Sequence, residues 1–389
     1  MKRWLRPTLV IGSVTALIGL AAVPGHASAA PARVSPGTFE RPVYLKVPSY
    51  AKSVAIGKVT GNGRNDLVVY GDFSSGYLWM YPQEKNGKLG PPQKLSVPGY
   101  PDDSPVTIAD LYGNGQNEVL LVGSDGLRVF AAKNGRLASP YTIPIPTGVA
   151  DYTVANVNGD RYPDIIVSNG SDDVSVYDGS AKHTFRLGQT VRFTGGGVWY
   201  TSVFRASFRS GDRSDIAFFD GTDMDVRLHN ANGSYGPMTR YALAPIDGQV
   251  FSDVGAAAVG DLTGDGRQDL VLPNSANQPW SGVEVYAGSA SGRLAKPVTY
   301  PTLDSPGQLA IADLTGNGRN DLVVEHDDWA YVGVMMQGAN HRLSREVLYP
   351  VSGCCGFSFG SPAVGDLNGD GRPDIAIAAG DDVAVLYQK

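Results

Sequence analysis

The sequence predicts an all-β protein, a seven-bladed β-propeller of four-stranded antiparallel blades. Three observations lead to this prediction. A loop motif rich in Asp, Asn and Gly occurs seven times, short runs of β-branched and aromatic residues flank it, and no segment shows a sustained helical period. Repetition of one short unit along a chain indicates an array of similar supersecondary structures.

The motif carries oxygen-bearing side chains at its first, third, fifth and ninth positions and glycine at its fourth and sixth. Its best copy runs from Asp366 to Asp374. The ninth positions lie 52, 46, 51, 54, 52 and 53 residues apart, at Asp66, Glu118, Asp164, Asp215, Asp269, Asp321 and Asp374. A period of about fifty residues suits a propeller blade of four strands.

Each unit is expected to hold its four strands in the same order. In the first unit an apolar strand at 54–57 enters the motif, and a strongly apolar strand at 67–70 leaves it. An alternating strand at 77–81 follows, and a more polar strand at 93–97 ends the unit. Two stacked β-sandwiches are the alternative, but a sandwich gives no reason for one motif to recur seven times.

The two ends of the chain are expected to close the ring. The last unit stops after its third strand, at 383–387, whereas residues 41–48 form an unpartnered strand of the fourth type, similar to 296–301. We predict that this N-terminal strand completes the last blade, which would also protect an exposed sheet edge. The propeller domain is therefore expected to span residues 41–389.

The first 29 residues have the layout of a secretory signal peptide, and a short leader is expected over 30–40. Lys2, Arg3 and Arg6 precede an apolar stretch, and Ala27-Ser28-Ala29 offers a cleavage site. An uncleaved anchor is the alternative, but the apolar run is short for a membrane span. We therefore expect a secreted protein, monomeric and without a membrane span after cleavage.

The net charge disfavours a nucleic-acid partner. It is −6 for the whole chain and becomes −9 when the three basic residues of the signal are removed. Nucleic-acid binding needs a basic face.

The motif, D-x-[DNT]-G-[DN]-G-x-x-D between two apolar strands, resembles the FG-GAP/VCBS repeat family. This family includes the calcium-loop blades of integrin α-subunit propellers and many exported bacterial proteins. The resemblance covers essentially all of 41–389, and it implies a propeller fold. The family includes adhesion modules, sugar-binding lectins and polysaccharide lyases, so the fold does not fix the function. The Gly-Ala-Pro of integrins is absent after Val69 and Tyr70, which departs from the integrin pattern.

Hard oxygen ligands on a tight glycine turn favour calcium. The fifth, sixth and seventh loops are complete and are expected to bind it through side chains and one Arg carbonyl each: Asp261, Thr263, Asp265, Arg267 and Asp269; Asp313, Thr315, Asn317, Arg319 and Asp321; Asp366, Asn368, Asp370, Arg372 and Asp374. Two weaker loops offer Asn156, Asn158, Asp160 and Asp164, and Asp110, Asn114 and Glu118. Metal-free hairpin turns are the alternative, because Asp, Asn and Gly favour such turns.

The other loops depart from the ligand pattern. Tyr112 stands in a ligand position of the second loop, and Arg161 replaces a glycine of the third. Lys58 opens the first loop, where its ammonium could replace the cation and bridge to Asp66. The fourth loop, which ends at Asp215, has lost the site.

A ligand surface is expected on the face opposite the motif loops, where the repeats differ most. Aromatic rings stack on sugar C–H surfaces, and neighbouring polar groups hold hydroxyls. The candidates are Trp199, Tyr200, Trp280, His326, Asp328, Trp329, Cys354, Cys355 and Phe357. The alternative is that the aromatic side chains pack between blades.

Cys354 and Cys355 are adjacent and are the only cysteines. An oxidising compartment favours a disulfide, although neighbouring Cα atoms lie closer than most disulfides need. A vicinal disulfide is the leading prediction; free thiols or an intermolecular bond are the alternatives.

These features predict a non-enzymatic binding protein for an extracellular glycan or protein, and no catalytic residue is assigned. One alternative is a polysaccharide lyase or hydrolase acting through His326 and Asp328. Another is a protein-interaction or adhesion module that binds no glycan. The sequence contains no phosphate-binding loop.

Overall fold

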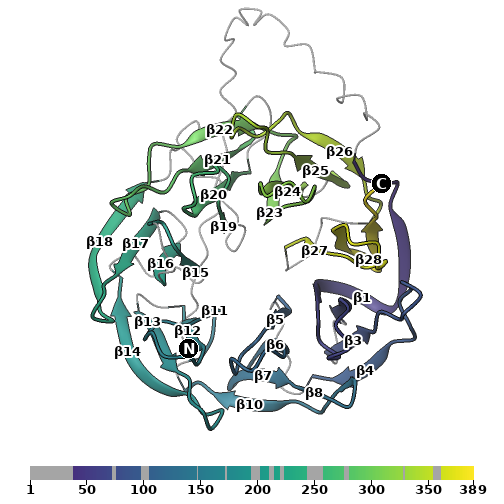
Figure 1. Cartoon of the computed structure of the whole chain (residues 1–389), viewed down its shortest axis with the longest axis horizontal. Helices are drawn as coiled ribbons and strands as arrows, with labels where there is room; N and C mark the ends of the chain where they lie inside the picture. The colour runs from purple at the N-terminus through teal and green to yellow at the C-terminus, as the bar shows by residue number, and fades with distance from the viewer. Residues whose placement is uncertain are drawn as a thin grey trace, which may run out of the picture. The chain divides into compact units, whose positions relative to one another are not determined.

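The computed structural model describes residues 38–71, 76–97, 105–146, 148–170, 173–193, 202–209, 214–219, 223–242, 257–275, 280–326, 329–353 and 361–389. Every regular element within these ranges is a β-strand. The sheets are arranged around a common centre, which confirms the predicted all-β propeller (Figure 1). The predicted signal peptide and leader up to residue 37 lie outside the described residues.

Five sheets are separate four-stranded antiparallel blades. In order, they consist of β5 (Thr107–Ala109), β6 (Glu118–Gly123), β7 (Gly126–Phe130) and β10 (Tyr141–Pro144); β11 (Asp151–Ala155), β12 (Asp164–Ser168), β13 (Asp173–Asp178) and β14 (Arg186–Arg192); β15 (Ser202–Ala206), β16 (Asp215–Phe219), β17 (Asp223–His229) and β18 (Tyr235–Ala242); β19 (Ala258–Gly260), β20 (Asp269–Asn274), β21 (Gly282–Tyr286) and β22 (Val298–Pro301); β23 (Pro306–Ala312), β24 (Asp321–His326), β25 (Tyr331–Met335) and β26 (Val347–Pro350). A two-stranded hairpin, β8 (Ala132–Lys133) and β9 (Arg136–Leu137), follows β7.

The first and last units share one six-stranded sheet, where separate four-stranded blades were predicted. Its order is β27-β28-β1-β2-β3-β4, formed by β27 (Ala363–Gly365), β28 (Asp374–Leu386), β1 (Val43–Gly57), β2 (Asp66–Gly71), β3 (Tyr77–Tyr81) and β4 (Gln93–Ser96). The sheet is continuous because the long strand β1 pairs with two partners. Its first part pairs with β28, from Val43 opposite Val385 to Lys46 opposite Asp382, and its second part pairs with β2.

Residues just before β1 attach to the far end of the chain. The Phe39 side chain is buried, and its ring meets that of Tyr349 edge-on at 5.8 Å between centroids. The Glu40 amide donates to the Tyr387 carbonyl over 2.8 Å, and the Lys389 amide donates to the Thr38 carbonyl over 2.9 Å. The predicted pairing of the N-terminal strand with the last unit is therefore present.

The blades pack through a repeated glycine contact at the end of the first strand. A Cβ atom on Gly260 would lie 2.6 Å from Ile311 Cγ2 of the next unit, and one on Gly57 would lie 2.9 Å from Ile108 Cγ2. Gly365 meets Ile56 in the same way, at 2.5 Å. Contacts this short exclude a larger side chain, so the last and first units pack as consecutive neighbours do.

The second strand of each unit forms the core. Val323 and Val324, for example, are fully buried and point to opposite faces of their sheet. Val323 packs toward the last unit, whereas Val324 packs toward the unit before it. These strands read as continuous apolar runs because both of their faces are covered by neighbouring blades.

Candidate functional site

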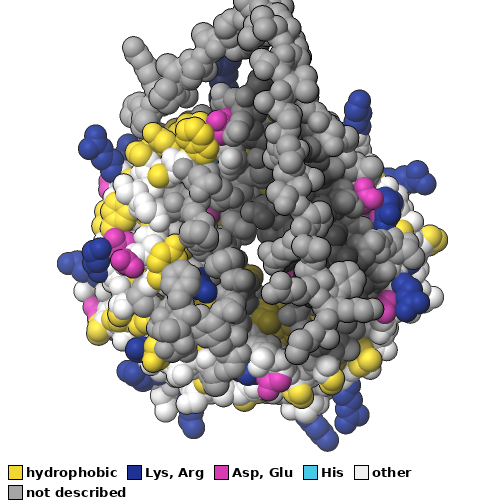
Figure 2. Space-filling view, turned by 180° about the vertical axis from the view of Figure 1, so that it is seen from behind, with side chains coloured by type: hydrophobic (Ala, Val, Ile, Leu, Met, Phe, Trp, Pro, Cys, Tyr) yellow, Lys and Arg dark blue, Asp and Glu magenta, His cyan; other side chains and the backbone are white. Residues whose placement is uncertain are grey.

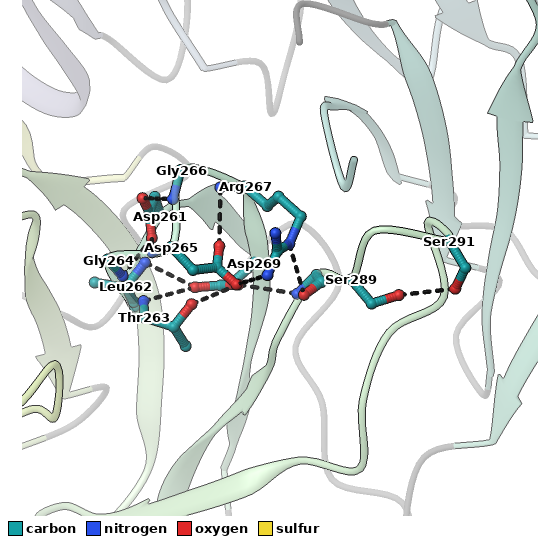
Figure 3. Close-up of polar contacts among 11 residues, drawn as sticks. Asp261, Leu262, Thr263, Gly264, Asp265, Gly266, Arg267, Asp269, Ser289 and Ser291 are labelled. Carbon is teal, nitrogen blue, oxygen red and sulfur yellow. Dashed lines mark hydrogen bonds and ion pairs between the residues drawn. The ribbon is translucent and has the colours of Figure 1, made fainter. Parts of the chain in front are cut away.

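The ninth position of each motif loop is a buried carboxylate that braces its blade. In the fifth unit the Asp269 side chain is fully buried at the start of β20. Its Oδ2 accepts from the Leu262 and Thr263 amides, over 2.8 and 2.9 Å. Its Oδ1 accepts from the Gly288 amide, just beyond β21, over 2.9 Å, and from Thr263 Oγ1 over 3.3 Å (Figure 3). One carboxylate thus joins the loop to the end of the third strand.

This arrangement recurs in six of the seven units that the structure describes. The amide of the residue in or just after the third strand donates to the ninth-position Oδ1 over 2.7–3.0 Å; the donors are Gln83, Gly179, His229, Gly288, Gln337 and Gln388. The bond is present at Asp215, whose loop lacks the ligand pattern. The brace therefore does not depend on a metal-binding sequence.

Burial raises the pKa of several of these carboxyl groups. It brings the pKa of Asp269 and of Asp374 to about 6, from an ordinary value of 3.8, although backbone hydrogen bonds partly oppose the shift. Burial also raises the pKa of Glu118 to about 7. Outside the motif, burial raises the pKa of Asp151 to about 6. Hydrogen bonds from the Val203 and Tyr152 amides partly oppose this shift. The fold therefore favours the protonated form of each of these groups.

The first and fifth positions of the complete loops lie on the exposed side of the turn. Asp261 accepts the Gly264 amide on Oδ1, over 2.5 Å, and the Gly266 amide on Oδ2, over 2.8 Å. Asp366 makes the same two contacts with Gly369 and Gly371, over 2.5 and 2.8 Å. Each carboxylate oxygen has more than one lone pair, so these contacts leave acceptor capacity facing solvent.

The fit of calcium to these loops is mixed. The donors have the right chemistry, since hard oxygens from Asp, Asn and Thr are calcium ligands. However, no group of three or more His, Cys, Asp or Glu side chains converges as a metal site within the described ranges. Asp265 is instead paired with the Arg267 guanidinium, and Asp370 with that of Arg372 over 2.7 Å. A cation in the fifth or seventh loop would have to displace that arginine.

The arginine at the seventh position has a structural role that the sequence did not reveal. Arg64 Nε donates to the Gln83 carbonyl over 2.9 Å, and Arg267 and Arg319 make the equivalent bond to Gly288 and Gln337. In each case the ninth-position carboxylate accepts from the amide of that same residue. The end of the third strand is thus held on both sides of one residue.

The loops with incomplete ligand sets are filled by other side chains. In the fourth, Arg209 NH2 lies 2.6 Å from both Asp215 Oδ1 and the His229 carbonyl, so a guanidinium occupies the interior. In the second, the Tyr112 ring stacks on His183 of the next unit, with centroids 4.0 Å apart. Lys58 is exposed, and no ion pair joins it to Asp66 within the residues that the structure describes, so the bridge predicted for the first loop is absent.

Side chains at the eighth position link neighbouring loops. Asn117 donates to the Lys58 carbonyl over 3.2 Å, and Asn320 donates to the Asp261 carbonyl over 3.1 Å. Asn65 reaches the Asp366 carbonyl over 3.3 Å and so links the first loop to the last. In each case the acceptor is the first residue of the preceding unit's loop. The recurrence of Asn at this position was visible in the sequence and could have indicated the link.

Two of the predicted ligand residues are exposed aromatic side chains. Trp280 is 53% exposed and Trp329 is 46% exposed. They lie in the loops before β21 and β25, which join second to third strands in the fourth and fifth four-stranded blades. In an antiparallel blade this end is opposite the end that carries the motif loops. Both side chains therefore face solvent on the predicted surface.

His326 lies at the same end but inside the protein. It is fully buried, its Nδ1 lies 3.0 Å from the Asp304 carbonyl, and its Nε2 lies 2.7 Å from Glu346 Oε1. Glu346 crosses over Gly333 to reach it, and a Cβ on Gly333 would lie 1.9 Å from Oε1. Both ring nitrogens are engaged away from solvent, so the geometry is that of a core histidine.

The remaining ligand predictions lie outside the described residues. They concern Trp199, Tyr200, Asp328, Cys354, Cys355 and Phe357, together with the disulfide.

Basic side chains are dispersed on the face shown in Figure 2. Among the described residues that this view shows, most Lys and Arg side chains project at the edge of the face. Among the described residues there is also no helix with the length and apolar character that a membrane crossing requires.

Comparison with solved structures finds proteins of the same fold. An Agrocybe aegerita lectin with specific recognition of non-reducing terminal N-acetylglucosamine has a TM-score of 0.55 at 18% identity, over 78% of this chain and 80% of the lectin. BBS1N, in complex with ARL6DN, has a TM-score of 0.55 at 12% identity, over 90% of this chain and 98% of that one. At these identities the likeness concerns the fold. No curated protein matches the sequence.

Family models match the N-terminal and the C-terminal parts of the propeller sequence. An FG-GAP-like repeat matches residues 58–121 and 110–167, and an FG-GAP repeat matches residues 359–386. These matches include the motif loops at both ends and agree with the resemblance in the sequence. The chain is thus a protein with repeats of the FG-GAP family.

Proposed function

We propose that this protein is a secreted, non-enzymatic binding module for extracellular carbohydrate. The observation that carries the proposal is the exposure of Trp280 and Trp329 on loops at the same end of consecutive blades. A buried tryptophan would contribute to the core, whereas one that is about half exposed on a loop offers a flat apolar face to a ligand. The lectin of the same fold supports this class of ligand by analogy only.

The geometry favours binding over catalysis. The alternative, a lyase or hydrolase, was expected to act through His326 and Asp328. His326 is buried with both ring nitrogens engaged, and Asp328 lies outside the described residues. A general base must reach the proton that it removes. We therefore do not assign His326 a catalytic role. Its side chain stabilises the end of β24, where the His326 carbonyl accepts from the Trp329 amide over 3.2 Å.

A glycan array combined with a turnover screen on the same polysaccharides tests this function. We expect binding to a subset of glycans and no release of product from any of them. Product formation would support an enzyme instead. Binding to no glycan, together with specific capture of an extracellular protein, would support the protein-interaction alternative.

We also propose that the six-stranded sheet comprises two blades, which would give seven in total. The support is that β28 contains two apolar segments, Asp374–Ala379 and Val383–Leu386, with Gly380 at positive φ between them. The first segment pairs with β27 and the second pairs with β1. The strand order of each half then equals that of the other blades.

We propose, further, that calcium binds the fifth, sixth and seventh loops through Asp261, Asp313 and Asp366 and the other oxygens predicted there. The exposed acceptor capacity of Asp261 and Asp366 supports this proposal. Binding requires ionised carboxylates, and in two loops it requires an arginine to leave its aspartate.

The pH dependence of stability separates the protein's own carboxyls from calcium. In EDTA the free energy of unfolding should fall as the pH rises from about 5 to about 7.5. The carboxyls of Asp151, Asp269 and Asp374 have a folded pKa of about 6. The folded pKa lies above the pKa of the same carboxyl in the unfolded chain. The stability that these groups contribute is therefore fully present below the unfolded pKa and is lost as the pH rises through the folded pKa.

Calcium should act in the opposite direction, raising the melting temperature more at pH 7.5 than at pH 5, by about 5 °C or more at saturation. Thermal melts in EDTA and in calcium at both pH values measure both effects. Asp313→Asn should reduce the response to calcium without changing the slope in EDTA. Identical melts in calcium and EDTA at pH 7.5 would remove the calcium proposal, and a slope of opposite sign in EDTA would contradict the assignment of the buried carboxyls.

A further inference from the structure

A polar cavity lies where the first and last units meet, at the end of the propeller that carries the motif loops. Its volume is about 540 Å³, within the range of small-molecule sites. It is lined by the first loop, the last loop and the turn after β3: Lys58, Gly63, Arg64, Asn65, Gln83, Glu84, Lys85, Asn86, Gly87, Asp366, Asn368 and Gly369. None of these residues has an aromatic or aliphatic side chain, so the cavity suits a small, strongly polar ligand.

Three of the lining side chains are cations, and they form no ion pair within the part of the chain that the structure describes: Lys58, Arg64 and Lys85. Lys58 is notable because it stands at the first position of its loop, where the fifth, sixth and seventh loops carry Asp261, Asp313 and Asp366. The first loop therefore presents a positive charge at the position where the complete loops present a negative one.

The two acidic lining residues already have partners. Asp366 accepts the Gly369 and Gly371 amides, and Glu84 Oε2 accepts from Asn86 Nδ2 over 3.3 Å. The lining thus carries three positive and two negative side chains in a chain whose net charge is −6. A local excess of positive charge in an acidic protein favours an anionic ligand.

The wall between the two units is built by buried contacts. Gln83, which is almost fully buried, donates through Nε2 to the Asp366 carbonyl over 3.1 Å, and Asn65 donates to the same carbonyl. Gly87, at a φ of 77°, lies so close to the last loop that a Cβ would be 1.8 Å from the Asn368 carbonyl. These contacts hold the turn after β3, which carries Lys85 and Asn86, against the last loop, which carries Asn368.

We propose that this cavity binds a saccharide that carries a carboxylate. The carboxylate would lie among Lys58, Arg64 and Lys85, and the amides of Asn86 and Asn368 would bind its hydroxyl groups. The saccharide class rests on the proposed function, but the site is separate from the tryptophan loops and lies at the other end of the propeller.

Titration calorimetry of the full chain in EDTA, at low ionic strength, tests the proposal with D-glucuronate, D-galacturonate, D-glucose and acetate as probes. We expect at least one uronate to bind, and neither glucose nor acetate to bind measurably. The variant K58A/K85A should weaken uronate binding about tenfold or more. Both lysines are exposed, so the fold should be retained.

Lys88→Ala is the matched control, because Lys88 is an exposed lysine of the same turn that does not line the cavity. It should leave uronate binding unchanged. Equal binding of acetate and uronates would overturn the saccharide assignment, and no binding of any probe, or an equal loss in K88A, would overturn the site. W280A/W329A should retain uronate binding, because the tryptophans lie at the other end of the propeller. Failure of the cavity proposal can therefore be distinguished from failure of the proposed function.

Discussion

Replacing Asp269 with alanine should lower the free energy of unfolding by about 3–5 kcal/mol, in EDTA as well as in calcium. The substitution leaves the amides of Leu262, Thr263 and Gly288 without their acceptor, and the site is fully buried. An unsatisfied buried donor costs about 1–3 kcal/mol, although such costs are not simply additive. Urea denaturation with calcium chelated measures the loss.

Two further substitutions distinguish a brace from a metal ligand. Asp215→Ala, in a loop without the ligand pattern, should cost a similar amount, because Asp215 accepts the Phe208 and His229 amides and pairs with Arg209. Asp261→Ala, on the exposed side of the same loop as Asp269, should cost about 1 kcal/mol or less in EDTA, since water can replace it. If D269A were destabilising only when calcium is present, the carboxylate would act as a metal ligand alone and the brace would be refuted.

A chain that begins at Ser49 should melt about 10 °C or more below one that begins at Thr38. The shorter chain loses the part of β1 that pairs with β28 between Val43 and Lys46, and it loses the buried Phe39 ring against Tyr349. It also exposes the edge of β28, which invites aggregation. Differential scanning calorimetry compares the two chains.

Phe39→Ala in the longer chain is the milder companion to this truncation. It should lower the free energy of unfolding by about 3–5 kcal/mol, because it empties a packed aromatic site without removing the strand. Melting temperatures within about 2 °C for the two chain lengths would show that the N-terminal strand does not stabilise the ring.

The fold was largely predictable because its signals are local and repeated. The strand predicted over 77–81 is β3, and the strand predicted over 67–70 lies within β2. The pairing of residues 41–48 with the last unit was also predictable, since an unpartnered strand and a missing strand imply each other. The continuous six-stranded sheet was not, because it depends on how β1 and β28 extend through their turns.

The candidate sites were less predictable because their contacts join residues far apart in the chain. The ninth-position carboxylates lie in the predicted loops, but their acceptor role depends on amides beyond the third strand, such as that of Gly288. Likewise, His326 stands in a suggestive loop but is buried because Glu346 reaches it over Gly333. Exposure of Trp280 and Trp329, which separates a binding surface from a core, depends on tertiary packing that no local pattern encodes.

The central claim is that the exposed tryptophans bind carbohydrate, and calorimetric titration of W280A/W329A with the strongest glycan from the array tests it most directly. We expect the double variant to lose about tenfold or more in affinity while keeping the wild-type melting temperature. Leu187→Ala, which removes an apolar side chain of comparable exposure from the outer strand β14, is the matched control and should bind as wild type does. An unchanged affinity in W280A/W329A would contradict the account.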